Sequence, residues 1–464
     1  MKRRPFFACF FFLPAAFGCQ PSADRPPEEK TPLSRAFQIE REVARLSSGE
    51  PLWPGFDPAA IPLAIFDGER TYLFRHPSPP PEFRAGEKAE AGASVFEGRH
   101  EAVSANTSAE IGGVRTATLM ADGFRQESSL TEIAAVAVHE TFHVFQRNTH
   151  PDWAANEASL FVYPVEDAAL LNLSRLETEA LRRAFAEAGA QICWAAQATQ
   201  FRKRRFETLD EAFVAYERGT ELNEGLANYV QLKAAASPTP RIPEEGYAAD
   251  AVRARAYATG SAYAMLLDAV EPEWRAGFDG RENAVLDEAL AAALEKRGDR
   301  TNGCGFREDE LSLAERQAQS DIAALLEGRK RARAAFDEQP GYRIEIHAAD
   351  GAPLMLQGFD PLNVSRLSGD EILHTRFLRL GGGSGDLEML DQEGADVSAL
   401  TVGAGPHPIF NGVTVFATVA PEKPVTGFDG EKTTVTAPGF RAAFFTAGIE
   451  TETRSDAIVI RLKK

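Results

Sequence analysis

Residues 134–146 have the sequence Ala-Ala-Val-Ala-Val-His-Glu-Thr-Phe-His-Val-Phe-Gln, which contains the pattern His139-Glu140-Thr-Phe-His143. Residues four apart lie on one face of a helix, so His139 and His143 can direct their imidazoles at one metal ion. Zinc accepts neutral imidazole nitrogen, and Glu140 lies beside the histidines, where it can take a proton from water. The stretch therefore predicts a zinc site on a helix.

The residues before this stretch support a helix. Ser129-Leu-Thr-Glu132 has the form of a capping box, in which the first and fourth side chains each bond to the backbone N–H of the other residue. Alanine, valine and phenylalanine fill the turns that follow. The alternative interpretation is a buried helix with two incidental histidines, and a third candidate ligand further along the chain argues against it.

A second stretch with helical spacing, residues 209–236, carries a row of polar side chains on one face. They are spaced by four, three and four residues: Glu217, Glu221, Glu224 and Asn228. A row of carboxylates is costly unless positive charge lies beside it. A metal ion or the basic run Phe201-Arg-Lys-Arg-Arg-Phe206 could supply that charge. An exposed acidic face and a solvated basic face are the plainer alternatives.

Asn223-Glu224-Gly225-Leu-Ala227 resembles the Asn-Glu-Gly-x-Ala segment of gluzincins, the class of metallopeptidases that includes thermolysin and alanyl aminopeptidase. In that class the glutamate is the third zinc ligand, so the resemblance implies this role for Glu224. Tyr257-Ala-Thr-Gly260 resembles a later Tyr-x-x-Gly segment whose hydroxyl stabilises the oxyanion. The resemblance covers about residues 110–270. Two other tyrosines could serve instead, or pack in the core: Tyr229 or Tyr263.

Two other patterns of zinc peptidases are absent. Metzincins place glycine three residues and histidine six residues after the second histidine, where this chain has Gln146 and Thr149. His150 is one residue too far to replace that ligand. The Gly-x-Met-Glu-Asn segment with which aminopeptidases hold the substrate amine is missing, so exopeptidase action is not implied. The spacer from His143 to Glu224 is longer than in familiar gluzincins and implies a helical insertion.

The expected site has zinc bound by His139, His143 and Glu224. Glu140 acts as the general base, and Tyr257 steadies the oxyanion. Either of two further side chains could orient a ligand: Glu221 or Asn228. The expected activity is hydrolysis of peptide or protein substrates. The alternatives are a zincin-fold protein that binds or scaffolds without turnover, and a metallohydrolase that acts on a non-peptide amide.

Residues 1–19 have the composition of an export signal. Lys2-Arg-Arg4 is a positive start, Pro5–Phe17 is an apolar run too short to span a membrane well, and Ala16-Phe-Gly-Cys19 resembles a bacterial lipoprotein cleavage box. Residues 20–32 are rich in proline and glutamate, as expected of a flexible tether. The sequence thus predicts a protein anchored in the bacterial cell envelope through a lipid on Cys19, with an ordinary secretory signal as the alternative.

The remaining cysteines and the net charge limit the partners. Export would allow Cys193 and Cys304 to form a disulfide, and two buried thiols are the alternative. The formal net charge of −18 gives no basic field for nucleic acid. The expected partners are therefore a peptide substrate and the membrane that holds the lipid.

The overall pattern predicts an α+β protein with a C-terminal all-β domain, and the resemblance to gluzincins implies that the preceding part is a zincin-like catalytic domain. Residues 33–127 combine a helix with short strands, including a hairpin around Asp67-Gly68, and residues 128–338 are mainly helical. Residues 341–464 alternate in short strands, as in a sandwich or barrel. In zincins the edge strand of a sheet before the metal helix pairs with extended substrate, and Val114–Met120 is the candidate for that strand.

Overall fold

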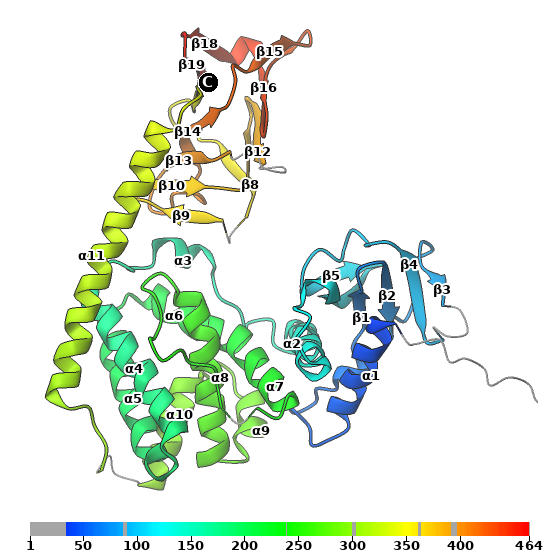
Figure 1. Ribbon diagram of the computed structural model, residues 1–464, viewed down its shortest axis with the longest axis vertical. Coiled ribbons are helices and arrows are strands. Elements are labelled where there is room, and N and C mark those ends of the chain that lie inside the picture. The colour runs from blue at the N-terminus through cyan, green and yellow to red at the C-terminus, as the bar shows by residue number, and fades with distance from the viewer. Residues whose placement is uncertain are drawn as a thin grey trace, which may run out of the picture.

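The computed structural model describes residues 34–86, 91–237, 239–298, 303–360, 363–390 and 397–463. They form an N-terminal six-stranded sheet, a central helical region and two C-terminal β-sheets (Figure 1), which confirms the predicted α+β class. The predicted signal with Cys19 and the predicted tether lie outside the described residues. Within the described part, no helix has the length and apolar character needed to cross a bilayer.

The N-terminal sheet follows helix α1 (Arg35–Ser47). Its strands are β1 (Leu63–Phe66), β2 (Arg70–Phe74), β3 (Arg84–Ala85), β4 (Ala93–Glu97), β5 (Thr107–Ile111) and β6 (Val114–Met120). They are hydrogen-bonded in the order β3-β4-β2-β1-β6-β5. β1 and β2 form the predicted hairpin, in which Asp67 Oδ1 accepts hydrogen bonds from the backbone N–H groups of Glu69 and Arg70.

The prediction that Val114–Met120 is the edge strand is wrong. This strand, β6, pairs with β1 on one side and with β5 on the other, so both of its edges are occupied. The terminal strand on this side of the sheet is β5, which is joined to β6 through Gly112 and Gly113, both at positive φ. Because β5 is short and mostly polar, its sequence gives little sign of a strand, and its place is set by the pairing with β6.

The helices of the central region are α2 (Leu130–Thr149), α3 (Ala158–Val162), α4 (Ala168–Ala186), α5 (Gln191–Phe206), α6 (Glu211–Thr220), α7 (Leu226–Ala234), α8 (Val252–Val270), α9 (Trp274–Asp279), α10 (Leu286–Arg297) and α11 (Glu308–Glu338). α2 packs against β6 and against α7, and Figure 1 shows it between the sheet and the other helices. Ile65 of the sheet, Phe142 of α2 and Leu266 of α8 belong to one hydrophobic core. The sheet and the helices therefore pack around α2.

A disulfide joins α5 to the segment before α11. The Sγ atoms of Cys193 and Cys304 are 2.05 Å apart, and the two residues are 111 positions apart in the sequence. Of the two alternatives left open by the sequence, the structure therefore has the disulfide. Such bonds are typical of oxidising compartments outside the cytoplasm, which supports an extracytoplasmic location.

The C-terminal part consists of strands β7 (Tyr342–His347), β8 (Met355–Phe359), β9 (Val364–Arg366), β10 (Glu371–His374), β11 (Phe377–Gly382), β12 (Gly385–Leu390), β13 (Ala399–Gly403), β14 (Val413–Ala420), β15 (Val425–Phe428), β16 (Lys432–Ala437), β17 (Phe440–Phe445), β18 (Ile449–Thr453) and β19 (Ala457–Leu462). One sheet has the order β18-β19-β7-β14-β13-β10-β9 and the other β15-β16-β17-β12-β11-β8. Phe416 of the first sheet and Phe444 of the second belong to one core. The two sheets thus form a sandwich.

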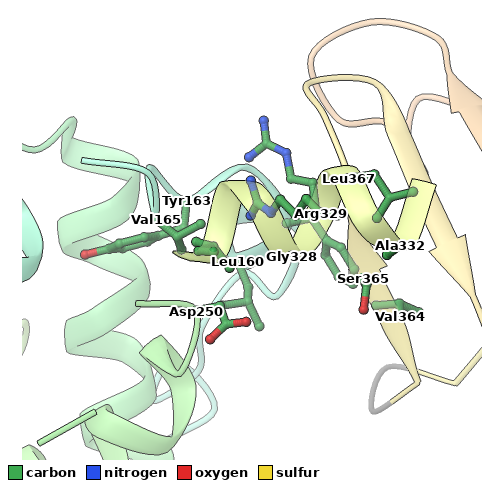
Figure 2. A pocket seen from close by; sticks show the side chains of 13 residues that line it. Leu160, Tyr163, Val165, Asp250, Gly328, Arg329, Ala332, Val364, Ser365 and Leu367 are labelled. Atoms are coloured by element: carbon green, nitrogen blue, oxygen red, sulfur yellow. The ribbon is translucent and has the colours of Figure 1, made fainter. Parts of the chain in front are cut away.

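A cavity of about 400 Å³ lies where the helical region meets this sandwich. Figure 2 shows side chains around it from the α3 segment, from α11 and from β9, among them Leu160 and Arg329. Phe161 of α3 also contacts Phe359 and Phe410 of the C-terminal part, with ring centres 5.6 and 5.4 Å away. The lining contains none of the metal ligands predicted from the sequence, so this cavity is separate from that site.

Candidate metal centre

The helix that carries the two histidines starts where the sequence predicts. Ser129 Oγ accepts a hydrogen bond from the backbone N–H of Glu132, and Glu132 Oε2 accepts one from the backbone N–H of Ser129, which confirms the capping box. Further along α2, the rings of His139 and His143 have centres 4.7 Å apart. The two side chains are largely buried, so the helix holds them side by side within the protein.

Glu224 reaches the histidines from a π-helical turn. Residues Glu221–Gly225 form this turn between α6 and α7, and the backbone N–H of Leu226 bonds to the carbonyl of Glu221, five residues back. The sequence predicts an uninterrupted helix here, so the extra residue in the turn was not foreseen. Glu224 faces the two histidines, whereas Glu217 and Glu221 before it are paired with arginines. Such turns occur frequently at functional sites.

The three candidate ligands converge on one point. Nε2 of His143 lies 3.0 Å from Nε2 of His139 and 3.2 Å from Oε2 of Glu224, and Nε2 of His139 lies 3.7 Å from the same oxygen. Zinc bonds of about 2.1 Å at tetrahedral angles separate donor atoms by about 3.4 Å. The observed triangle has that size. Among the described residues, this is the one group of three such side chains that could hold a metal ion.

Gln146 orients His143 and ties it to the turn that carries Glu224. Its Oε1 accepts a hydrogen bond from Nδ1–H of His143 at 2.9 Å, and its amide nitrogen donates to the carbonyls of Leu222 and Asn223 at 2.8 and 3.0 Å. Because that nitrogen is committed to two carbonyls, the amide oxygen faces the imidazole. This places the proton of His143 on Nδ1 and leaves Nε2 able to bind a metal.

The electrostatic field at the triangle favours a cation. Burial raises the pKa of Glu224, but hydrogen bonds with His139, His143 and Tyr257 outweigh burial and hold that pKa well below its ordinary range. Burial also opposes protonation of His143, yet the carboxylates of Glu224 and Glu140 outweigh it and raise the His143 pKa. Positive charge is therefore attracted to the place where the three donor atoms meet.

Glu140 lies next to the ligands and is itself buried. Burial raises the pKa of Glu140, while His139 and His143 oppose the rise and the Glu224 carboxylate supports it. A carboxylate accepts a proton more readily when its pKa is nearer to neutrality. The position and the environment of Glu140 thus match those of a general base.

Of the three candidate tyrosines, Tyr257 is the one beside the ligands. Its ring is stacked on that of His139 with centres 6.4 Å apart, and its hydroxyl hydrogen-bonds with Glu224. Burial and the Glu224 carboxylate raise the pKa of Tyr257, so its hydroxyl stays neutral and can donate. The other two hydroxyls are bonded to carboxylates elsewhere: Tyr229 to Asp268 and Tyr263 to Glu177.

The two side chains predicted to orient a ligand are bonded elsewhere. Glu221 accepts hydrogen bonds from Arg202 and Thr259. Asn228 donates to the backbone carbonyl of Tyr257 at 3.3 Å. Asn228 thus holds α7 to α8 beside Tyr257, whereas Glu221 belongs to a buried ionic cluster. The residue found to orient a ligand directly is Gln146, which sequence reasoning missed although it lies three residues after a histidine on the same helix.

The buried ionic cluster contains two arginines of the basic run and the first two glutamates of the acidic stripe. It joins six side chains that are almost fully buried: Arg202, Arg205, Arg255, Glu177, Glu217 and Glu221. Burial raises the pKa of Glu217, but Arg205 and Arg255 outweigh it and hold that pKa well below its usual range. Arg202 and Arg205 of the run are thus internal partners for glutamates, whereas Lys203 and Arg204 are exposed, so each alternative that the sequence left open applies to half of the run.

No family model, no curated protein and no solved structure matches the chain. The resemblance to gluzincins therefore rests on the motifs alone. What the structure adds is a buried His-His-Glu group, held by a helical region, that could bind a metal ion.

Proposed function

We propose that the protein is a zinc-dependent hydrolase of peptide bonds with the ligand set of a gluzincin. The observation that carries this proposal is the convergence of Glu224 on His139 and His143. A catalytic zinc site needs three protein ligands and one open position, and the two histidines of the helix supply only two. A glutamate from a separate helix completes the set and leaves one position available.

The surrounding side chains suit a hydrolytic reaction. Zinc, when bound, would supply a Lewis acid that polarises the scissile carbonyl and makes water more acidic. Glu140 would accept a proton from the attacking water at its carboxylate and pass it to the leaving nitrogen, and the raised pKa of this buried group suits that exchange. The neutral hydroxyl of Tyr257 would donate a hydrogen bond to the oxyanion, typically worth about 3 kcal/mol.

We assign the peptide substrate to the outer edge of β5. This strand is one of the two terminal strands of its sheet, and α2 contacts both β5 and its neighbour β6. A peptide that added to this edge would gain backbone hydrogen bonds beside the metal helix. In this proposal Thr107–Ile111, and not Val114–Met120, is the strand that pairs with the extended substrate.

The proposed activity belongs to the cell envelope. Residues 1–19 resemble a lipoprotein signal with Cys19 as the lipid acceptor, and the Cys193–Cys304 disulfide suits an oxidising compartment. Mass spectrometry of the mature N-terminus tests the anchor. A lipid on Cys19 would support the proposed anchor. An unmodified N-terminus at another residue would contradict the anchor but would not affect the hydrolase proposal.

The hydrolase proposal is tested by metal analysis together with a peptide library. We expect the purified mature protein to carry zinc and to cleave peptides. Glu140→Gln should keep zinc and lose hydrolysis, and Glu224→Ala should lose zinc. Full activity in Glu140→Gln would remove Glu140 from the mechanism, and an unchanged zinc content in Glu224→Ala would reassign the third ligand.

The same experiment separates the alternatives. A wild-type protein that binds zinc but cleaves no peptide would defeat the peptidase proposal. Cleavage of a panel of non-peptide amides would then identify a metallohydrolase of another class. No cleavage of either panel would leave a metal-binding protein without turnover.

A further inference from the structure

Arg253 lies against the third candidate ligand and has no part in the reaction described above. Its Nη2 donates a hydrogen bond to Oε1 of Glu224 at 2.8 Å, and its Nη1 pairs with Glu157. The guanidinium also lies over the ring of Tyr257, 5.7 Å from the ring centre. The Glu224 side chain is 9% exposed and that of Glu157 49%, so Arg253 extends from the buried ligand to the surface.

The two carboxylate oxygens of Glu224 have different partners. Oε2 faces the Nε2 atoms of His139 and His143 at 3.7 and 3.2 Å, whereas Oε1 is bonded to Arg253. A carboxylate binds zinc through both oxygens only if both come within about 2.0–2.2 Å of the metal. Rotation of Glu224 into that arrangement would break a charge-assisted hydrogen bond to a guanidinium, which is among the stronger hydrogen bonds in proteins.

We infer that Arg253 is a positioning residue that holds Glu224 in a one-oxygen orientation toward the metal and thereby keeps the site at four ligands, three from the protein and one water. The inference rests on the proposed function, because it requires that His139, His143 and Glu224 hold a metal. Arg253 acts through Glu224 and not on the substrate. The same guanidinium contacts Tyr257, so it also fixes the place of that hydroxyl relative to the ligand.

A residue that merely neutralised the Glu224 carboxylate would respond differently to substitution. Lysine keeps the positive charge but lacks the planar fork with which Arg253 bonds to Glu224 and Glu157 together. If charge alone mattered, Arg253→Lys would behave as wild type. Glu157 gives a matched control, because it holds the same guanidinium from the exposed side and an exposed ion pair contributes little.

The test uses cobalt(II) in place of zinc, since cobalt(II) absorbs more strongly in the visible with four ligands than with five, the number reached if both Glu224 oxygens bound beside the water. The mature protein is compared with Arg253→Met, Arg253→Lys and Glu157→Gln. We expect Arg253→Met to bind cobalt with weaker absorption and to lose 10- to 100-fold in kcat with little change in KM, the size usual for residues that support a ligand. Arg253→Lys should recover part of the cobalt absorption and part of kcat, and Glu157→Gln should match wild type in both measurements.

The outcomes separate the inference from the proposed function. Wild-type cobalt spectra in both Arg253 variants would overturn the inference and leave the hydrolase intact. A wild-type protein that binds neither cobalt nor zinc would overturn both. Circular dichroism checks that each variant is folded, and Arg253→Lys keeps the comparison valid if Arg253→Met does not fold.

Discussion

Gly225 and Gly260 pack backbone to backbone where α8 crosses the π-helical turn. A Cβ atom on Gly225 would lie 2.7 Å from the Cα of Gly260, and one on Gly260 would lie 2.8 Å from the Cα of Gly225. These glycines belong to the two separate motifs that contain Glu224 and Tyr257. Their contact explains why both motifs need glycine, because it brings the ligand and the tyrosine together.

Gly225→Ala should therefore damage the metal centre and the fold together. The added methyl group must push α8 away from the turn, and such overpacking costs about 1–3 kcal/mol of the free energy of unfolding. Zinc affinity should fall in the same variant, since Glu224 adjoins the displaced residue. Gly328→Ala is the matched control, because a Cβ there meets nothing within 4 Å in the middle of a helix. It should be neutral or slightly stabilising. Equal behaviour of the two variants in urea unfolding would contradict the contact.

Gln146 should affect zinc binding more than stability. Gln146→Ala removes the acceptor that holds Nδ1–H of His143 and the donor that reaches Leu222 and Asn223. We expect zinc affinity, measured by competition with a chelator, to fall 10- to 100-fold. Gln146→Glu keeps an acceptor for His143 but loses the donor, so it should fall between wild type and Gln146→Ala. An unchanged affinity in both variants would show that His143 is oriented without Gln146.

Substitution of Glu221 should mainly lower the free energy of unfolding, whereas substitution of Glu224 should mainly abolish metal binding. Glu221→Gln removes one charge from the buried ionic cluster and leaves Arg202 undercompensated, which should cost about 3 kcal/mol or more of the free energy of unfolding. Glu224→Gln should lose zinc while the metal-free protein stays much closer to wild type in stability. The measurements are urea unfolding with chelator present and zinc content of the folded variants. Loss of zinc in the folded Glu221→Gln variant would contradict this division.

The sandwich should lose stability in acid because of His374. Burial lowers the pKa of His374 from 6.5 to about 4. Between these values the unfolded chain binds the proton and the folded chain does not, so stability is fully present above pH 6.5 and is lost as the pH falls toward 4. The shift corresponds to about 3 kcal/mol. His374→Leu should flatten this dependence, as measured by hydrogen exchange along β10 and β13. The same pH dependence in the variant would rule out His374 as its source.

The fold class and the group of three candidate metal ligands can be predicted from the sequence because their signals are local or chemical. Zinc restricts the ligand types, and the helical period fixes the spacing of His139 and His143. Capping residues and turn residues place the first metal helix and the hairpin at Asp67. Glu224 requires more, since it is recognised through the resemblance of its segment to a known motif and not through its distance along the chain.

The residues that support the candidate ligands, and the order of the strands, depend on contacts between distant segments of the chain. Gln146 bonds to Leu222, and Arg253 bonds to Glu224 and Glu157, and no pattern along the chain marks these pairs. The order of strands that places β6 inside the sheet likewise follows from pairing in three dimensions. The stripe of carboxylates cannot be interpreted from its spacing for the same reason. A π-helical turn interrupts the helix, Glu221 pairs with a buried arginine, and Glu224 faces the histidines.

The segment that contains the short helix α3 contacts both Arg253 and the sandwich. Glu157, just before its first residue, holds Arg253, while Phe161 near its end rests against Phe359 and Phe410. The two contacts are only four residues apart, which is about one helical turn. The interface with the sandwich and the surroundings of the third candidate ligand therefore share one short stretch of backbone.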